Sequence, residues 1–438
     1  MIATAIENTK TAWLGEFPPH WEVLRIKNLF QEMDSRSETG SEELLSVSHY
    51  TGVTLKRESL ENEDDHLSNA ESLVGYKLVQ ANDLVINIML AWNGSLGISP
   101  YNGMTSPAYC VYRIKGDNNP EYFGYLFATN LFKSEFRRNS TGIIDSRLRL
   151  YSDKFFSLFS VVPPKGEQVE IVQYIKVQEE KINLFIQKKK RFIELLKEQK
   201  NGIVSEFISK GINSKAEYKF SGIDWIGNIP VNWEIKRLRF IGQCQNGINK
   251  GAEFFGSGFP FVSYGDVYNN EMIPEIIEGS VVSTEDDRQN YSVIEGDVFF
   301  TRTSETVEEI AISSACMQTI PNATFSGFLI RFRPYKDILY SGFSKYYFRC
   351  QLHRSFFVKE MNLITRASLN QDLLKNLPVI IPPIEEQKQI VEHIKTETAI
   401  IDTAIAKAEK EIELIKEYKE AMISEAVMGK IIVNLAIK

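Results

Sequence analysis

The chain has 438 residues, of which 43% are hydrophobic, so it is long enough to bury more than one core. Its formal net charge of -7 excludes a protein that holds nucleic acid through overall positive charge, so any basic binding surface must be local. The four cysteines show no CxxC pair and no zinc spacing, and neither a signal peptide nor a membrane-spanning run is visible, which predicts a cytoplasmic protein without a metal site.

The chain contains an internal repeat. WLGEFPPHWEVLRIKNL (Trp13 to Leu29) matches WIGNIPVNWEIKRLRFI (Trp225 to Ile241) at an offset of 212. Farther along, VPPKGEQVEIVQYI (Val162 to Ile175) matches IPPIEEQKQIVEHI (Ile381 to Ile394) at an offset of 219. Because matching ends enclose divergent middles, the sequence predicts two copies of one structural unit.

The middle of each copy is predicted to be a mixed α/β domain. Short β-rich runs alternate there with Gly, Asn and Asp turn signals, and short helical stretches follow the strands. Examples of these runs are DLVINIML, AYCVYRI, FPFVSYGDV, GDVFFTR and GFLIRFR. Trp21 and Trp233 stand beside alternating apolar residues, so we interpret them as core side chains rather than as base-stacking ones.

A long helix is predicted after each Pro-Pro pair. Apolar residues recur at multiples of 3.5 to 3.6 over Glu167–Ile208 and again over Ile390–Ala426. A helix of about 40 residues is about 60 Å long and needs a partner for its apolar stripe, so the simplest partner of each helix is the other. Gln178, Lys189 and Lys200 fall on the seam of the first helix, where they either fix the register or are solvated. The predicted stripe of the first helix is Ile171, Ile175, Ile182, Phe185, Phe192, Leu196, Ile203 and Phe207.

Two motifs carry a resemblance to a known family. W-x-G-x-x-P-x-x-W and PP-x-x-EQ-x-x-I each occur twice, and the chain resembles the specificity subunits of type I restriction–modification enzymes along essentially its whole length. Segments similar to those of the family's target-recognition domains are LLSVSHYTGV (Leu44 to Val53), AWNGSLGISPYNGMTSPAY (Ala91 to Tyr109), FVSYGDVY (Phe261 to Tyr268) and TRTSETVEEIAISS (Thr301 to Ser314).

The resemblance implies a fold and a set of partners. The fold is α+β, with two mixed α/β target-recognition domains separated by two long helices that pack antiparallel as a coiled coil, and with an internal pseudo-twofold repeat. Each domain would read one half of a bipartite double-stranded DNA target. The helices would act as a spacer ruler and dock two adenine-N6 methyltransferase subunits, through which restriction/translocase subunits join the complex in anti-phage defence; no membrane partner is expected. The implied segments are residues 1–164 (first domain), 165–210 (central helix), 211–383 (second domain) and 384–438 (C-terminal helix and tail).

Catalytic motifs are absent from the sequence. It contains no G-x-x-x-x-G-K-[ST] phosphate loop, no methyltransferase signature of Asn or Asp before Pro-Pro and an aromatic residue, and no histidine spacing for a metal. We therefore expect a non-catalytic chain that binds no cofactor, with S-adenosylmethionine, ATP and Mg²⁺ on the partner subunits. The alternatives are a recognition fragment of a single-chain restriction–methyltransferase, which the missing motifs disfavour, and a purely structural coiled coil, which the divergent globular middles disfavour.

The residues expected to contact DNA fall into three groups. SRLRL (146–150) matches TRASL (365–369), so one arginine recurs in both copies, and it either reads guanine, grips a phosphate or forms a structural ion pair. Polar residues and amides suited to adenine edges form a second group, for which an ordinary loop is the alternative. Further cations of the first copy are expected to bind phosphates. The candidates are Arg147, Arg149, Arg366, Ser368, Asn370, Gln371, Arg302, Thr303, Ser304, Lys56, Arg57, Arg137 and Arg138.

Overall fold

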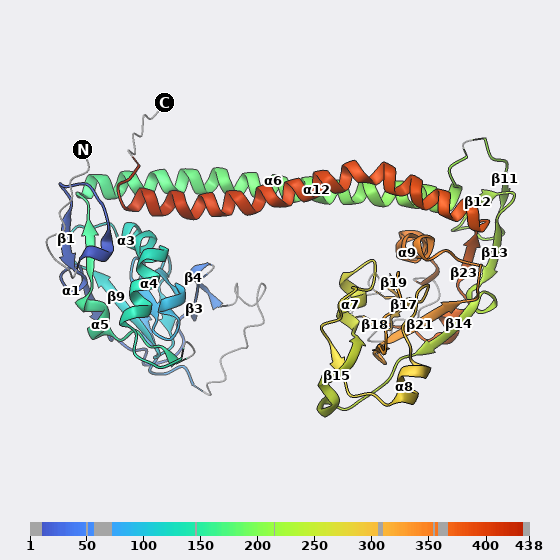
Figure 1. Cartoon of the computed structure of the whole chain (residues 1–438). Coiled ribbons are helices and arrows are strands. Elements are labelled where there is room, and N and C mark those ends of the chain that lie inside the picture. Colours follow the sequence, from blue (N-terminus) through green and yellow to red (C-terminus); the bar gives the residue numbers. More distant parts are fainter. Residues whose placement is uncertain are drawn as a thin grey trace. The chain divides into compact units, whose positions relative to one another are not determined.

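The chain forms two compact units in a computed structural model (Figure 1). One unit is Met1–Lys189 with Lys410–Lys438, and the other is Lys190–Glu409. The long helices α6 (Lys165–Lys210) and α12 (Ile384–Val427) each contribute one half to each unit. The division into four segments stays a prediction. The structure describes residues 11–49, 51–56, 72–144, 147–213, 215–304, 310–353, 355–357 and 367–431.

A four-stranded antiparallel sheet lies at the centre of each domain. Its strand order is β2-β9-β6-β7 in the first unit and β14-β21-β17-β19 in the second, so the two sheets are equivalent. The central strands β6 (Leu84–Asn87) and β17 (Val298–Thr301) are buried at every residue, which explains their nearly continuous apolar sequences LVIN and VFFT. The remaining strands are β2 (Phe30–Met33), β7 (Leu96–Ile98), β9 (Tyr109–Ile114), β14 (Gly242–Asn246), β19 (Ser313–Ala315) and β21 (Leu329–Pro334).

The strands that open and close each domain pair with each other. β1 (Glu22–Arg25) runs antiparallel to β10 (Phe159–Val162), and β13 (Glu234–Arg237) runs antiparallel to β23 (Pro378–Ile381). The opening motif of each copy therefore lies beside the strand that leads into its Pro-Pro pair. This pairing explains why the ends of the repeat match while the residues between them diverge.

Smaller sheets and helices surround the central sheets and confirm the prediction of one mixed α/β domain per copy. In the first unit they are η1 (Ala12–Leu14), α1 (Ile26–Leu29), β3 (Leu45–Ser48), β4 (Gly52–Leu55), β5 (Lys77–Val79), η2 (Ala91–Asn93), β8 (Gly103–Thr105), α3 (Pro120–Phe127), α4 (Asn130–Asn139) and α5 (Ser152–Ser157). In the second unit they are β11 (Tyr218–Phe220), β12 (Asn228–Pro230), η4 (Leu238–Phe240), η5 (Ala252–Phe254), β15 (Phe255–Val262), α7 (Tyr264–Asn269), β16 (Ser280–Val281), α8 (Glu285–Asn290), β18 (Thr303–Ser304), β20 (Thr324–Phe325), α9 (Ser341–Arg349), η6 (Gln351–His353), β22 (Ala367–Ser368) and α11 (Gln371–Lys375).

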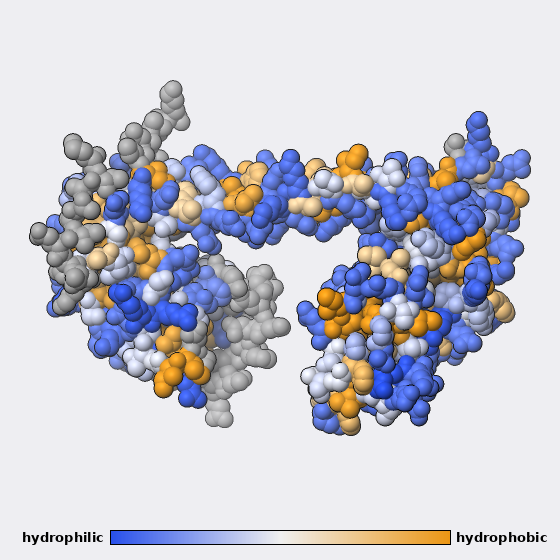
Figure 2. All heavy atoms as spheres, in the orientation of Figure 1, coloured by the Kyte–Doolittle hydropathy of each residue, from blue (hydrophilic) through white to orange (hydrophobic). Residues whose placement is uncertain are grey.

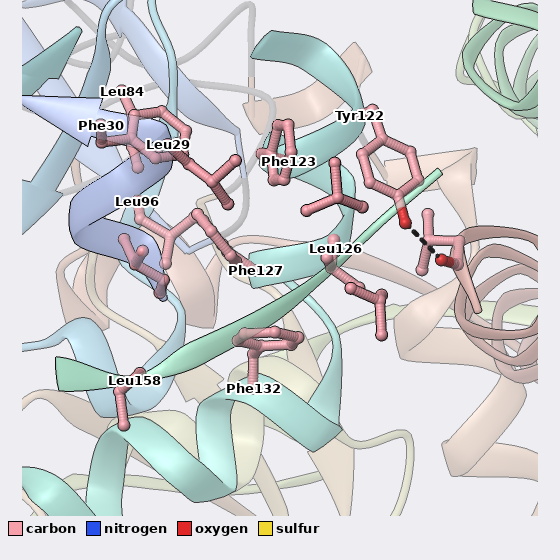
Figure 3. Packing of buried hydrophobic residues seen from close by; sticks show 14 of the residues in the cluster. Leu29, Phe30, Leu84, Leu96, Tyr122, Phe123, Leu126, Phe127, Phe132 and Leu158 are labelled. Atoms are coloured by element: carbon pink, nitrogen blue, oxygen red, sulfur yellow. Dashed lines mark hydrogen bonds between the residues drawn. The ribbon is translucent and has the colours of Figure 1, made fainter. Parts of the chain in front are cut away.

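The core of the first unit is rich in aromatic side chains. Helix α3 begins with Pro120 after the N-cap Asn119, an arrangement that favours a helix start at this point. Its apolar face packs against α1, β2 and α4 (Figure 3). The hydroxyl of Tyr122 donates to the carbonyl oxygen of Val427 at 2.8 Å, so the end of α12 is fixed on this core. The buried side chains of α3 are Tyr122, Phe123, Leu126 and Phe127.

The two tryptophans of the opening motifs lie in the cores, as predicted. Trp21 is 5% exposed and Trp233 is fully buried. Each packs beside a glycine that follows the end of a long helix: Gly429 after α12 for Trp21, and Gly211 after α6 for Trp233. Both glycines have a left-handed backbone conformation, which helix ends commonly adopt. The end of α6 therefore packs in the core of the second unit, and the end of α12 packs in the core of the first.

Contacts between α6 and α12 establish that the helices pack antiparallel within each unit. The residue number rises along α6 while the number of its partner in α12 falls. In the first unit Glu179 pairs with Lys419 at 3.1 Å and Lys189 with Glu411 at 2.5 Å, and in the second unit Lys200 pairs with Asp402 at 2.7 Å and the ring of Phe207 meets that of His393 at 4.5 Å.

One part of the predicted seam is wrong. Phe185 and Phe192 are 38% and 45% exposed, and Ile193 is buried instead. The seam continues from Ile182 through Lys189, Ile193, Lys200, Val204 and Ile208, one stripe away from the two phenylalanines. Lys189 and Lys200 form ion pairs with α12 across this seam, although both side chains stay partly exposed to solvent.

Candidate nucleic-acid interface

A buried ion pair braces the central sheet of each domain. Asp83, just before β6, accepts two hydrogen bonds of 2.8 Å from Arg113 of β9, and Asp297, just before β17, accepts bonds of 2.6 and 2.7 Å from Arg333 of β21. The two aspartates are 1% and 0% exposed. The bonds to Asp83 raise the pKa of Arg113 above its ordinary value. Two parallel hydrogen bonds between a carboxylate and a guanidinium fix the position of the two adjacent strands relative to each other.

The Pro-Pro-x-x-Glu-Gln motif has a structural role in both units. Gln168 and Gln387 are fully buried at the starts of the long helices. Each side-chain oxygen accepts a backbone N–H of the domain, from Asn119 at 2.7 Å and from Tyr340 at 2.8 Å. Each side-chain nitrogen donates to a proline carbonyl at 2.8 Å and to a second acceptor at 2.9 Å. The glutamine therefore fastens the domain to its helix and is not available to read DNA.

In the first unit, α4 carries two exposed candidate cations. The guanidinium of Arg137 lies 5.4 Å from the centre of the Trp92 ring, and the indole nitrogen of Trp92 donates to the Met89 carbonyl at 3.1 Å. Arg138 forms a 2.8 Å ion pair with Glu135. Stacking on a fixed tryptophan holds a guanidinium in place.

Two further arginines lie in the loop that follows α4. Arg147 is exposed, and Arg149 is half-buried and donates to the Leu148 carbonyl at 2.8 Å. Lys56, at the end of β4, is half-buried, whereas Arg57 lies outside the described residues. The structure thus gathers Arg137, Arg138, Arg147 and Arg149 around the end of α4.

In the second unit, two segments that are far apart in the sequence meet. Strands β18 and β22 pair, so that Thr303 lies opposite Ser368, and the backbone N–H of Leu369 donates to the Arg302 carbonyl at 2.7 Å. The guanidinium of Arg302 donates to the Gly327 carbonyl at 2.8 Å. Only the backbone of Ser304 and Ser368 is described, and Arg366 lies outside the described residues.

The amides that were expected to read adenine have different environments. The side-chain oxygen of Asn370 accepts the backbone N–H of Leu373 at 2.8 Å, so it caps the start of α11. Gln371 is the first residue of that helix and is half-buried. The hydroxyl of Tyr264 in α7 donates to the Thr303 carbonyl at 3.0 Å, which adds a residue of the FVSYGDVY segment to the group. Sequence reasoning missed this contact because the segments are 39 residues apart.

The described residues contain no group of three or more His, Cys, Asp and Glu side chains that could hold a metal ion. Within the same part of the chain, no helix combines the length and the apolar character needed to cross a bilayer.

Comparisons with known proteins identify similar sequences over the full length of the chain. The family model for the type I restriction modification DNA specificity domain matches residues 230–414. The type I restriction enzyme MjaVIII specificity subunit of Methanocaldococcus jannaschii is 24% identical over 97% of this chain and 96% of its own length. A putative type I restriction enzyme MjaX specificity subunit of the same organism is 22% identical, with 97% of both chains covered.

A solved structure supports the fold. A chain from work on complex assembly and conformational transition of the type I R-M system superimposes with a TM-score of 0.63, covering 95% of this chain and 99% of its own length at 14% identity. At this identity the match bears on the fold alone. The mixed α/β domains and paired long helices of this chain are therefore an arrangement already seen in a solved structure.

Proposed function

The chain belongs to the family of type I restriction–modification specificity subunits, and from this premise we propose that each of its two domains reads one half of a bipartite double-stranded DNA target. The observation that carries the proposal is that the two units share the same central framework of strands but carry their candidate residues on different elements. Both units share the sheet order and the Asp–Arg brace, but the candidate cations of the first unit lie on a helix and loop, whereas Arg302 of the second unit lies beside a two-stranded ribbon. Equivalent scaffolds with different surfaces suit two different half-sequences.

We further propose that two adenine-N6 methyltransferase subunits dock on the long helices and bring the restriction/translocase subunits into the complex. In the first unit, Val177, Leu184 and Phe185 of α6 are 43%, 50% and 38% exposed. Exposed apolar side chains on a helix that is already paired suit a further protein partner. S-adenosylmethionine, ATP and Mg²⁺ belong to these partners in this proposal, and the complex works in the cytoplasm.

The long helices are proposed to set the spacing between the half-sites. At 1.5 Å per residue, the 46 residues of α6 span about 69 Å, which corresponds to about 20 base pairs of DNA. Lengthening this spacer requires insertions at facing positions. Lys200 and Lys419 are equivalent in the repeat, but they face Asp402 and Glu179, so insertions after both would shift the register.

Insertions after Lys190 in α6 and after Glu409 in α12 lie beside the Lys189–Glu411 contact and lengthen both helices together. Seven residues, about 10.5 Å, keep the seam in phase and should lengthen the preferred gap by about three base pairs. The two half-sequences should stay unchanged. Sequencing of methylated adenines in cells carrying the variant measures both, and an active enzyme with an unchanged gap would contradict the spacer role.

The proposed function is tested by expressing the chain with its methyltransferase and mapping methylated adenines. We expect methylation of one bipartite sequence by the complex, none by the chain alone, and a native mass of two methyltransferases per specificity subunit. In such a complex, Arg147→Ala should relax one half-sequence and leave the other intact. An equal loss of affinity for all sequences, with weaker salt dependence, would show that Arg147 binds phosphate.

A further inference from the structure

The first unit carries a closed loop between α4 and α5. Thr141 and Arg149 exchange two backbone hydrogen bonds of 2.9 Å at its base. Gly142 has a φ of +151°, and a Cβ at this position would lie 2.5 Å from the carbonyl oxygen of Arg147, so only glycine fits. Leu150 is 1% exposed and its backbone N–H donates to the Ile88 carbonyl at 2.9 Å. The loop is therefore attached firmly to the domain.

The loop displays two apolar side chains to solvent. Ile143 is 100% exposed and Ile144 is 53% exposed. Figure 2 shows that hydrophobic surface on this unit forms small patches among hydrophilic residues. A single exposed apolar residue needs no explanation, but two adjacent ones on a loop closed at its base are positioned in advance. Isoleucine is stiff at χ1, so a contact made by this pair loses little side-chain entropy.

The surroundings of the two isoleucines favour a polyanion. The last turn of α4, immediately before the loop, carries Arg137 and Arg138, and the loop itself carries Arg147 and Arg149. Glu135 of α4 is 7% exposed and is paired with Arg138. By sequence, residues 135–149 hold four arginines against two carboxylates, Glu135 and Asp145, so positive charge is in excess around the apolar pair.

The second copy of the repeat contains a similar pair. Leu363 and Ile364 precede Arg366 with one residue between, whereas two residues separate Ile144 from Arg147. These three residues of the second copy lie outside the described residues, so the likeness is one of sequence.

We propose that Ile143 and Ile144 contact thymine methyl groups in the half-site read by the first unit, while the guanidinium groups of Arg137 and Arg138 in α4 bind phosphates. This inference rests on the proposed function. Every A·T pair presents the thymine methyl group in the major groove, where apolar side chains recognise it. A half-site that is methylated on adenine contains at least one such pair.

The test uses the full chain in complex with its methyltransferase and duplexes that carry the mapped target. In one set of duplexes, deoxyuridine replaces the thymines of a single half-site and so removes only their methyl groups. The wild-type complex should bind one of the two substituted duplexes about three- to tenfold more weakly than the unmodified duplex. This factor follows from the free energy gained by burying a methyl group. The variant I143A/I144A should bind the unmodified duplex more weakly by a similar factor and lose its sensitivity to deoxyuridine.

Two controls separate contact from folding. The melting temperature of the variant should equal that of the wild type, because Ile143 is fully exposed and Ile144 is mostly so. Ile276→Ala, at a position that is 84% exposed in the second unit, should leave binding to every duplex unchanged.

Each other outcome overturns the inference. If the loss of binding free energy caused by deoxyuridine and the loss caused by I143A/I144A simply add when both are present, the isoleucines and the methyl groups do not touch. Loss of the methyltransferase with unaltered DNA affinity would make the loop a protein contact. A wild-type complex that binds no mapped duplex would overturn the proposed function itself, and this inference with it.

Discussion

Trp21 and Trp233 occupy matching positions in the two units but have different polar surroundings. The indole nitrogen of Trp21 donates to Glu167 at 2.8 Å, whereas that of Trp233 is buried without a hydrogen-bond partner among the described residues. Glu386, the counterpart of Glu167, accepts from Asn232 at 3.1 Å instead. Apolar packing of the tryptophan is therefore common to both units, whereas its hydrogen bond occurs only in the first unit.

The skeletons around these tryptophans are more alike than the surfaces. Asp83–Arg113 and Asp297–Arg333 hold equivalent strands, and Gln168 and Gln387 make matching bonds. The candidate DNA-binding residues, in contrast, come from different elements in each unit. Substitutions at the Asp–Arg pairs or the buried glutamines should therefore change stability equally in both units. Substitutions at residues that differ between the units should not.

The largest effect is expected from breaking the Asp–Arg braces. Asp83→Ala and Asp297→Ala each remove two charge-assisted hydrogen bonds to an arginine that stays about a third exposed, which costs about 2 to 4 kcal/mol. Chemical denaturation of the full chain, with hydrogen exchange to assign the loss to a unit, measures the effect. A loss below about 1 kcal/mol in either unit, or losses that differ greatly, would contradict the equivalence of the two braces.

A smaller and again equal effect is expected for the buried glutamines. Gln168→Ala and Gln387→Ala leave the backbone N–H groups of Asn119 and Tyr340 without their acceptors, at a cost of about 1 to 3 kcal/mol each. Faster hydrogen exchange should appear at Asn119 in the first variant and at Tyr340 in the second. Unchanged exchange at these amides would show that water replaces the side chain without loss.

Substitution of the two tryptophans should affect the stability of the two units differently. Trp21→Phe and Trp233→Phe remove the same volume, but only the first removes a hydrogen bond. Trp21→Phe should therefore destabilise the chain by about 1 kcal/mol more than Trp233→Phe. Denaturation of both variants in parallel decides the matter, and equal losses would mean that the Trp21–Glu167 bond adds no net stability.

The smallest effect is expected at the ion pairs between the helices. Double-mutant cycles of Lys189 with Glu411 and of Lys200 with Asp402 should give coupling energies of up to about 1 kcal/mol, because these side chains are partly solvated. The pair Lys410–Glu413 lies within α12 and serves as the control, with a coupling of about 0.5 kcal/mol or less. Couplings that exceed about 2 kcal/mol would mean that the pairs are more desolvated than their exposure indicates.

The repeat, the two mixed domains, the long helices and the burial of both tryptophans were all predictable from the sequence. These features follow from local patterns that a single sequence displays: apolar periodicity, proline positions and the matched motifs at the ends of each copy. The paired terminal strands of each domain are the structural basis of those motifs.

The helical stripe that forms the seam and the contacts between distant residues are visible only in the folded chain. Periodicity shows that an apolar face exists but does not choose between adjacent stripes, so Phe185 was placed on the seam although the ion pairs of Lys189 and Lys200 select its neighbour. The Asp297–Arg333 brace and the Thr303–Ser368 pairing join residues 36 and 65 positions apart. Such contacts depend on strand register across the folded domain, which no local pattern of residues encodes.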